Sequence, residues 1–177
     1  LSNLNALIAA RHNSGLGSDP NSVLLVSEDA HSSFIKCIRI MGLDEANLIR
    51  IKTDNNGSID IQNLRKTIDK CFIDNKKIFA IVATLGTTVR GAIDPIKDIS
   101  EICKERNIWL HIDGSIGGIF AITSIPIEGL NNINQANSIT INPQKIIGIT
   151  KTSSLLLVSE MSTLENTFST GLPYLSS

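Results

Sequence analysis

The sequence predicts an α/β fold, in which a mostly parallel sheet carries helices on both of its faces. Three observations support this prediction. Predicted strands alternate with predicted helices, and most of the strands are apolar at every position rather than at every second one. Such strands are typical of parallel sheets that helices cover on both sides. The chain has 177 residues, which is enough for one domain with a sizeable core.

The first part of the chain predicts two helices and two strands. Apolar side chains at helical spacing predict a first helix that ends near residues 13–15. Residues 23–26 are a short apolar run and predict the first strand. A helix over residues 32–41 follows, and Gly42 is a suitable stop signal for it. Residues 47–51 predict the second strand.

The middle of the chain repeats this alternation. Residues 54–57 predict a turn, after which Asp60 caps a helix that runs to about residue 72. Residues 77–83 predict the third and most apolar strand. Asp94-Pro95 opens another helix that runs to about residue 106, and the proline is expected at its first helical position.

The last part of the chain predicts the remaining strands. Residues 108–112 and 138–141 predict the fourth and fifth strands, and residues 153–158 are a candidate sixth. Residues 131–135 are polar and short, and we expect a loop there. In parallel sheets of this kind, ligands bind at the carboxyl ends of the strands. Polar residues that follow a predicted strand are therefore the first candidates for a site.

The composition excludes several classes of function. The chain is 42% hydrophobic and 19% charged, with a net charge of −1, as in an ordinary globular protein. It shows no basic stripe, so we expect no nucleic-acid partner. No apolar run approaches the ~18 residues of a membrane span. We see no signal peptide and no metal-ligand cluster, and we expect a cytoplasmic protein whose cysteines, at positions 37, 71 and 103, are free structural thiols.

Two polar residues that follow predicted strands suggest a specific chemistry. Asp113 ends the strand in Asn107-Ile-Trp-Leu-His-Ile-Asp113, and Lys145 lies in a short turn in Asn142-Pro-Gln-Lys145. A carboxylate can hold the proton on a pyridine nitrogen, and a lysine amine can form a Schiff base with an aldehyde. Pyridoxal phosphate (PLP) chemistry needs both groups. An acid after a strand can also be a cap or turn former, and a lysine in a turn is often a solvated surface charge. The apolar residues on both sides of Lys145 favour a functional lysine.

Further segments occur in the same order as in a known family. They are Ser-Asn-Leu-Asn-Ala-Leu-Ile-Ala-Ala-Arg at residues 2–11, Ser-Glu-Asp-Ala-His-Ser-Ser at 27–33, Ala-Thr-Leu-Gly-Thr-Thr at 83–88 and Gly-Ala-Ile-Asp-Pro at 91–95. Together with the segments around Asp113 and Lys145, they resemble the group II PLP-dependent amino-acid decarboxylases. This family includes the glutamate, aromatic amino-acid and histidine decarboxylases.

The resemblance implies a fold and a domain. The fold would be the PLP-dependent transferase-like large domain of fold type I, incomplete at both ends. Residues 1–177 would be a partial PLP-binding domain, without an N-terminal segment, which includes most of the phosphate loop, and without a C-terminal small domain. The chain begins with Leu1 at a helix without its approach loop, and we expect it to be a piece of a larger, homodimeric protein.

The resemblance also assigns roles to six residues. Lys145 would be the Schiff-base lysine, and Asp113 would form the salt bridge to the pyridinium nitrogen. His31 would stack on the cofactor ring and could contact the substrate carboxylate. The other three would contact the cofactor: Ser115 as a small residue against the ring, Thr88 near the ring substituents and Asn142 near the phosphate.

Some positions depart from the family or allow a second interpretation. Many members have His where this chain has Gln144, and Gln cannot transfer a proton near neutral pH. The family usually has Asp-Ala-Ala where this chain has Asp-Gly-Ser at 113–115. His31 alone could equally be structural, and Asn142 could be a turn former. We expect His111 to be structural and His12 to be exposed.

The function that the resemblance implies is decarboxylation of an L-amino acid to an amine and carbon dioxide, through a Schiff base on Lys145. Two alternatives stay open: a catalytically incomplete fragment or remnant of such an enzyme, or another PLP enzyme of fold type I, such as an aminotransferase or a lyase. The sequence does not select the substrate, so glutamate, an aromatic amino acid, histidine and diaminobutyrate all remain candidates.

Overall fold

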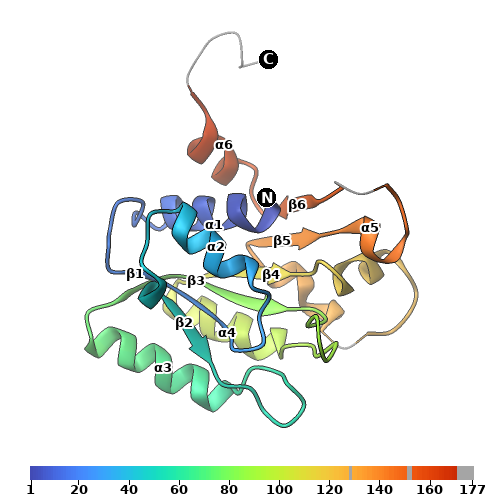
Figure 1. The fold of residues 1–177 in the computed structure, drawn as a ribbon, viewed down its shortest axis with the longest axis horizontal. Coiled ribbons are helices and arrows are strands. Elements are labelled where there is room, and N and C mark those ends of the chain that lie inside the picture. The colour runs from blue at the N-terminus through green and yellow to red at the C-terminus, as the bar shows by residue number, and fades with distance from the viewer. Residues whose placement is uncertain (128, 151–152, 171–177) are drawn as a thin grey trace.

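A computed structural model of the chain describes residues 1–127, 129–150 and 153–170. Among these residues, six strands form one sheet in the order β2-β1-β3-β4-β5-β6 (Figure 1). The first five strands are parallel, and β6 runs antiparallel to β5 at one edge. The strands are β1 (Ser22–Ser27), β2 (Leu48–Ile51), β3 (Lys77–Thr84), β4 (Trp109–Asp113), β5 (Ser138–Ile141) and β6 (Leu155–Val158).

Helices cover both faces of this sheet, as the alternation of elements predicts. Helices α1 and α2 lie on one face and α3 and α4 on the other, and α6 packs beside α1 (Figure 1). No helix in the described part of the chain is both long and apolar enough to cross a membrane. The helices are α1 (Ser2–Asn13), α2 (Ser33–Ile40), α3 (Ile61–Ile73), α4 (Ile96–Arg106), α5 (Pro143–Ile146) and α6 (Ser162–Phe168), with short 3₁₀ helices η1 (Glu45–Asn47), η2 (Gly117–Ile122) and η3 (Leu130–Gln135).

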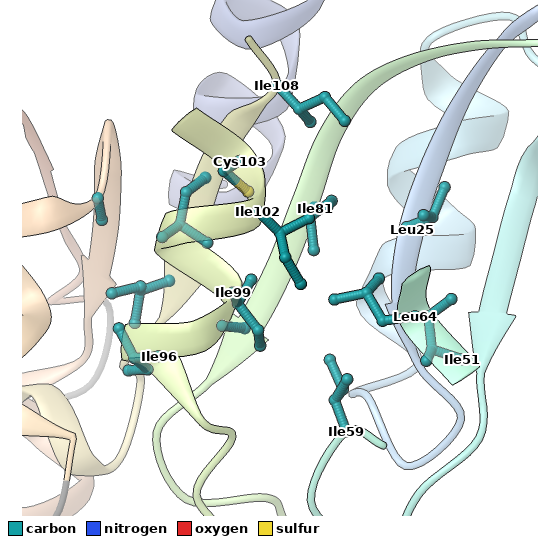
Figure 2. Packing of buried hydrophobic residues seen from close by; sticks show 14 of the residues in the cluster. Leu25, Ile51, Ile59, Leu64, Ile81, Ile96, Ile99, Ile102, Cys103 and Ile108 are labelled. Atoms are coloured by element: carbon teal, nitrogen blue, oxygen red, sulfur yellow. The ribbon is translucent and has the colours of Figure 1, made fainter. Parts of the chain in front are cut away.

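The two faces of the sheet bury separate apolar cores. Figure 2 shows the core under α3 and α4, where isoleucine and leucine side chains from both helices meet those of the strands. On the other face, α1 and α2 pack on β1 and β3 through a second apolar set that includes Leu7, Phe34 and Phe79. Because successive strand residues point to opposite faces, Trp109, His111 and Asp113 all face α1.

Most predicted elements are present within about two residues of their expected ends. The Asp60 side chain caps α3 by accepting the Asn63 N–H at 2.9 Å, as predicted. Gly42 follows α2 with a φ of +71°, which is the backbone conformation that a glycine stop signal supplies. The three cysteines are free and buried, which confirms their structural interpretation.

Three local predictions were wrong. Pro95 is the N-cap of α4 and not its first helical residue, because the helix begins at Ile96. Residues 131–135, expected to be a loop, lie in η3, where Leu130 and Ile133 pack against the core under α4. Lys145 lies in the short helix α5 and not in a simple turn, because Pro143 at the first helical position starts a helical segment.

Candidate functional site

A cavity of about 290 Å³ opens at the carboxyl ends of the parallel strands, between the sheet, the start of α1 and α2. Its volume is near the lower end of the ~300–1,000 Å³ range of small-molecule sites. All six residues that the sequence assigns to a site line this one cavity: His31, Thr88, Asp113, Ser115, Asn142 and Lys145. The fold therefore brings together residues that are up to 114 positions apart (145 − 31). Their individual roles remain predictions.

Asp113 lies in the middle of a row of polar residues at the end of the sheet. It pairs in register with Thr84 on β3 and with Thr140 on β5, so the three side chains point to the same face. All three are buried, and all three line the cavity. The hydroxyl groups of Thr84 and Thr140 have no hydrogen-bond partner in the described part of the chain. Buried hydroxyls normally have a partner, so these two indicate a polar ligand in the cavity.

The Asp113 carboxylate receives one N–H donor on each oxygen. The backbone N–H of Ser115 donates to Oδ1 at 3.1 Å. The side-chain Nδ2 of Asn3, in the first turn of α1, donates to Oδ2 at 3.2 Å. Hydrogen bonds to a charged carboxylate are stronger than those between neutral groups. The two donors therefore fix the orientation of the carboxylate toward the cavity.

His111 lies two residues before Asp113 on the same face of the sheet and is fully buried. Its Nδ1 is 2.8 Å from the Ser138 hydroxyl, and its Nε2 is 3.2 Å from Oδ1 of Asn3. Complete burial lowers the pKa of His111 to about 4, although the nearby charge of Asp113 acts in the opposite direction. The imidazole is therefore neutral at physiological pH, in keeping with the structural role expected for it.

A second hydrogen-bonded chain lies along the wall next to the N-terminus of α1. The hydroxyls of Ser2 and Ser154 are 2.8 Å apart, and Ser154 donates to Oδ1 of Asn142 at 2.6 Å. Asn142 in turn donates to the Ser115 hydroxyl at 3.2 Å. The Asn142 side chain makes no capping bond to α5, so it serves the wall of the cavity rather than the turn before Pro143.

Lys145 lines the cavity from α5, and its residue is exposed. The isoleucines that follow it are also half exposed, at 47% for Ile146 and 54% for Ile147. The sequence-based reason for a functional lysine, an apolar surround that makes a free charge costly, is therefore wrong. What supports a functional Lys145 is its place in the cavity that Asp113 also lines. Lys36 of α2 is the other lysine among the described residues of the lining.

His31 and Thr88 lie on exposed loops at the rim of the cavity. The imidazole of His31 is oriented by the backbone, because its Nδ1 accepts the N–H of Ser33 at 3.1 Å. The loop that carries Thr88 is closed by the N–H groups of Gly86 and Thr87, which both donate to the carbonyl of Ala92. His12 is exposed at the end of α1, as expected, and has no part in the cavity.

Glycines allow the chain to pass close to the strands just after Asp113. A Cβ atom on Gly117 would lie 2.7 Å from the carbonyl oxygen of Leu85, and one on Gly114 would lie 3.0 Å from that of Thr140. The first distance is too short for any side chain, and the second is tight. Gly114, where the family usually has alanine, thus matches a close approach of β4 to β5 in this chain.

Sequence analysis did not assign a role to five residues of the site: Ser2, Asn3, Thr84, Thr140 and Ser154. Thr84 and Thr140 could have been found, since each is a polar residue at or near the end of an apolar strand. Asn3 and Ser154 carry no such signal, because their roles come from contacts between residues more than 100 positions apart.

Comparison with known proteins links this site to one family. Residues 2–177 match the sequence model of the family described as the pyridoxal-dependent decarboxylase conserved domain. The acidic amino acid decarboxylase GADL1 of Xenopus tropicalis is 35% identical over 133 residues, which are 75% of this chain and 26% of that protein. GADL1 of Mus musculus is 33% identical over 150 residues, which are 85% of this chain and 27% of that protein. The chain thus spans about a quarter of the length of these relatives.

Solved structures share the fold. The crystal structure of mouse CSAD superposes with a TM-score of 0.87 at 28% identity, over 92% of this chain and 36% of that chain. That of Catharanthus roseus tryptophan decarboxylase, in complex with L-tryptophan, superposes with a TM-score of 0.89 at 29% identity, over 96% of this chain and 38% of that chain.

Proposed function

The chain belongs to the pyridoxal-dependent decarboxylase family, and from this premise we propose that the protein removes the carboxylate of an L-amino acid as carbon dioxide. Its cofactor would be PLP, and Lys145 would be the residue that binds PLP. The observation that carries the proposal is the cavity that Asp113 and Lys145 both line at the carboxyl ends of the strands. An oriented carboxylate and a lysine amine facing one cavity are the two groups that PLP needs from a protein.

The residues of the cavity fit this cofactor. The buried hydroxyls of Thr84 and Thr140 lack protein partners and can bond to a polar ring. The first residues of α1 line the same cavity, and the N–H groups at the start of a helix bind phosphate. Ser2, Ser154 and Asn142 lie on this wall, so the phosphate would be held there. Asp113 would hold the proton on the ring nitrogen, and His31 would cover the ring.

Each protein group would then have a distinct task. Lys145 would bind the cofactor aldehyde through its amine and release it when an amino acid takes its place. Asp113 would keep the ring nitrogen protonated. When bound, PLP supplies an electron sink for the electron pair that carbon dioxide leaves behind. Gln144 cannot replace the proton-transferring histidine of many relatives, so another group or water would return the proton to the product.

The experiment is a covalent trap. The protein is mixed with PLP and reduced with borohydride, and the labelled peptide is mapped in wild type, Lys145→Ala and Lys36→Ala. Lys36→Ala is the matched control, because Lys36 lines the same cavity. A label on Lys145, lost only in Lys145→Ala, supports the proposal. A label on Lys36 contradicts the assignment of Lys145. No label in wild type contradicts the proposal and favours a remnant that no longer binds the cofactor.

Release of carbon dioxide from amino acids tests the reaction itself. Acidic amino acids come first, because both GADL1 relatives are named acidic amino acid decarboxylases. Tryptophan and 2,4-diaminobutyrate follow, because structural neighbours at 29% and 27% identity are named for them. Transfer of the amino group to a keto acid, without carbon dioxide, would instead identify an aminotransferase.

The same proposal includes a homodimer. Exposed isoleucines next to Lys145, at positions 146, 147 and 149, support an interface beside the cavity. Light scattering of the purified protein would test it, and a monomer that still labels Lys145 would separate the dimer from the cofactor assignment.

A further inference from the structure

Four hydrogen bonds connect the start of β4 to the Asp113 carboxylate at its end. They join Trp109, Ser138, His111 and Asn3 in that order, and the last bond reaches Oδ2 of Asp113. Three of these residues come from strands, while Asn3 comes from the first turn of α1. Nothing in this chain of contacts is needed to form the sheet, because every bond is between side chains.

The donor and acceptor at each step follow from the chemistry of the groups. A carboxylate only accepts, so Asn3 must present its NH₂ group to Asp113 and its Oδ1 to His111. His111 must then carry its proton on Nε2, since Oδ1 also only accepts. Because the buried ring is neutral, its Nδ1 is an acceptor and takes the hydroxyl proton of Ser138. The oxygen of Ser138 in turn accepts the indole N–H of Trp109 at 2.8 Å.

Every donor in this series points the same way, toward Asp113. A rotation of the Asn3 amide by half a turn would place oxygen against oxygen at Asp113 and N–H against N–H at His111. The carboxylate of Asp113 and the Nε2–H of His111 both oppose that rotation, so the ring holds the Asn3 amide from the side opposite to Asp113.

We propose that His111 is a positioning residue for the cofactor site: through Asn3 it fixes the Asp113 carboxylate in the orientation that receives the ring nitrogen of PLP. The inference rests on the proposed function, because it assigns to Asp113 the task of binding that nitrogen. His111 itself does not touch the cavity, and the lining includes Asn3 and Asp113 but not His111.

The test uses two substitutions that each keep one half of the imidazole. Glutamine at 111 can keep an N–H donor near the position of Nε2, whereas asparagine keeps only an acceptor near Nδ1. The dissociation constant for PLP is measured by fluorescence in wild type, His111→Gln, His111→Asn and Asn3→Ala. We expect Asn3→Ala and His111→Asn each to weaken binding about tenfold, the loss of one oriented hydrogen bond, and His111→Gln to stay within about threefold of wild type.

The decisive measurement is the double variant Asn3→Ala/His111→Asn. If His111 acts through Asn3, the second substitution adds nothing once Asn3 is gone, and the double variant binds PLP like Asn3→Ala. If the two losses multiply, His111 acts through packing alone and the inference is overturned. Equal losses in His111→Gln and His111→Asn would also overturn it.

A second readout works without cofactor and without substitution. The ¹⁵N shifts of the His111 ring in the PLP-free protein report the tautomer directly. The Nε2–H form is expected, and an Nδ1–H form or an imidazolium at neutral pH would contradict the assignment. If instead wild type fails to bind PLP at Lys145, the proposed function fails, and the tautomer still shows whether the hydrogen-bond series is as described.

Discussion

Asp94 and Thr84 are joined by reciprocal hydrogen bonds. The backbone N–H of Asp94 donates to the carbonyl of Thr84 at 3.0 Å, and the N–H of Thr84 donates to the Asp94 carboxylate at 2.7 Å. The other carboxylate oxygen accepts the N–H of Ile59 at 2.8 Å. A single buried side chain thus ties the loop before α3 and the start of α4 to the end of β3, where Thr84 reaches the cavity.

Asp94→Ala is expected to lower the free energy of unfolding by about 2–6 kcal/mol. The substitution leaves the two buried N–H groups of Ile59 and Thr84 without acceptors, and each such group costs about 1–3 kcal/mol. Urea unfolding of the PLP-free protein measures the change, and Asp98→Ala on the exposed side of α4 is the control. A loss no larger than that of the control would show that the Asp94 bonds do not hold the strand end.

The pH dependence of stability is expected to contain a contribution from His111. Burial lowers its pKa from 6.5 to about 4, so below pH 6.5 the unfolded chain binds a proton that the folded protein does not. Stability therefore falls as the pH decreases from 6.5 to 4, by up to about 3 kcal/mol. Asp94 acts oppositely, because burial raises its pKa from 3.8 to about 6 and the folded protein then binds the extra proton in that window.

Comparison with a variant separates these two groups. His111→Gln removes the histidine titration and keeps that of Asp94. As the pH falls from 6.5 to 4, the unfolding free energy of wild type should therefore decrease relative to that of the variant. A difference that stays constant with pH would show that His111 titrates alike in both states.

The order of strands and helices could be predicted because burial patterns are local. Residues that are neighbours in the sequence determine the apolar strands around residues 24 and 80, and the same holds for the Asp60 cap. The same is true of Asp113 and Lys145, which follow strands whose ends meet at one edge of the sheet. Lys145 was nevertheless found for a wrong reason, since the residue itself is exposed and the isoleucines that follow it, Ile146 and Ile147, are exposed as well.

What could not be predicted depends on contacts across the fold. Asn3 reads as an ordinary helix residue, and only the packing of α1 on β4 places its amide at Asp113. Arg11 likewise reads as a surface charge at a helix end, but it is 7% exposed in the structure. Sequence spacing shows which residues share one face of a helix. It does not show which residues of another helix or strand that face contacts.

Arg11→Lys is expected to destabilise the protein by about 1–3 kcal/mol. The guanidinium of Arg11 donates to the carbonyls of Leu16, Asp19 and Met41 and to the Ser22 hydroxyl, at 2.9–3.0 Å. A lysine ammonium cannot make this planar set of bonds, so buried carbonyls lose their donors. Thermal and urea unfolding would measure the loss. Arg65→Lys, at an exposed ion pair with Glu105, should change stability by less than about 0.5 kcal/mol.

Gly117→Ala is expected to destabilise the protein by about 1–3 kcal/mol. The new Cβ would lie 2.7 Å from the backbone carbonyl oxygen of Leu85, so the backbone itself must move. Gly17→Ala is the matched control, because nothing lies within 4 Å of a Cβ at that position. Equal unfolding midpoints for the two variants would contradict the close approach of η2 to the end of β3.

Thr84→Val and Thr140→Val are expected to change stability and cofactor binding in opposite directions. Each substitution keeps the shape of the side chain and removes a buried hydroxyl that has no partner in the described part of the chain. In the PLP-free protein the loss of such a hydroxyl should be neutral or stabilising, by up to about 1 kcal/mol. If the hydroxyls bond to the cofactor, the same variants should bind PLP several-fold more weakly.

Unfolding of the PLP-free protein and PLP titration, measured on the same samples, separate the two effects. A variant that loses stability without cofactor would show that its hydroxyl has a structural partner, and unchanged PLP affinity in both variants would remove these residues from the cofactor site.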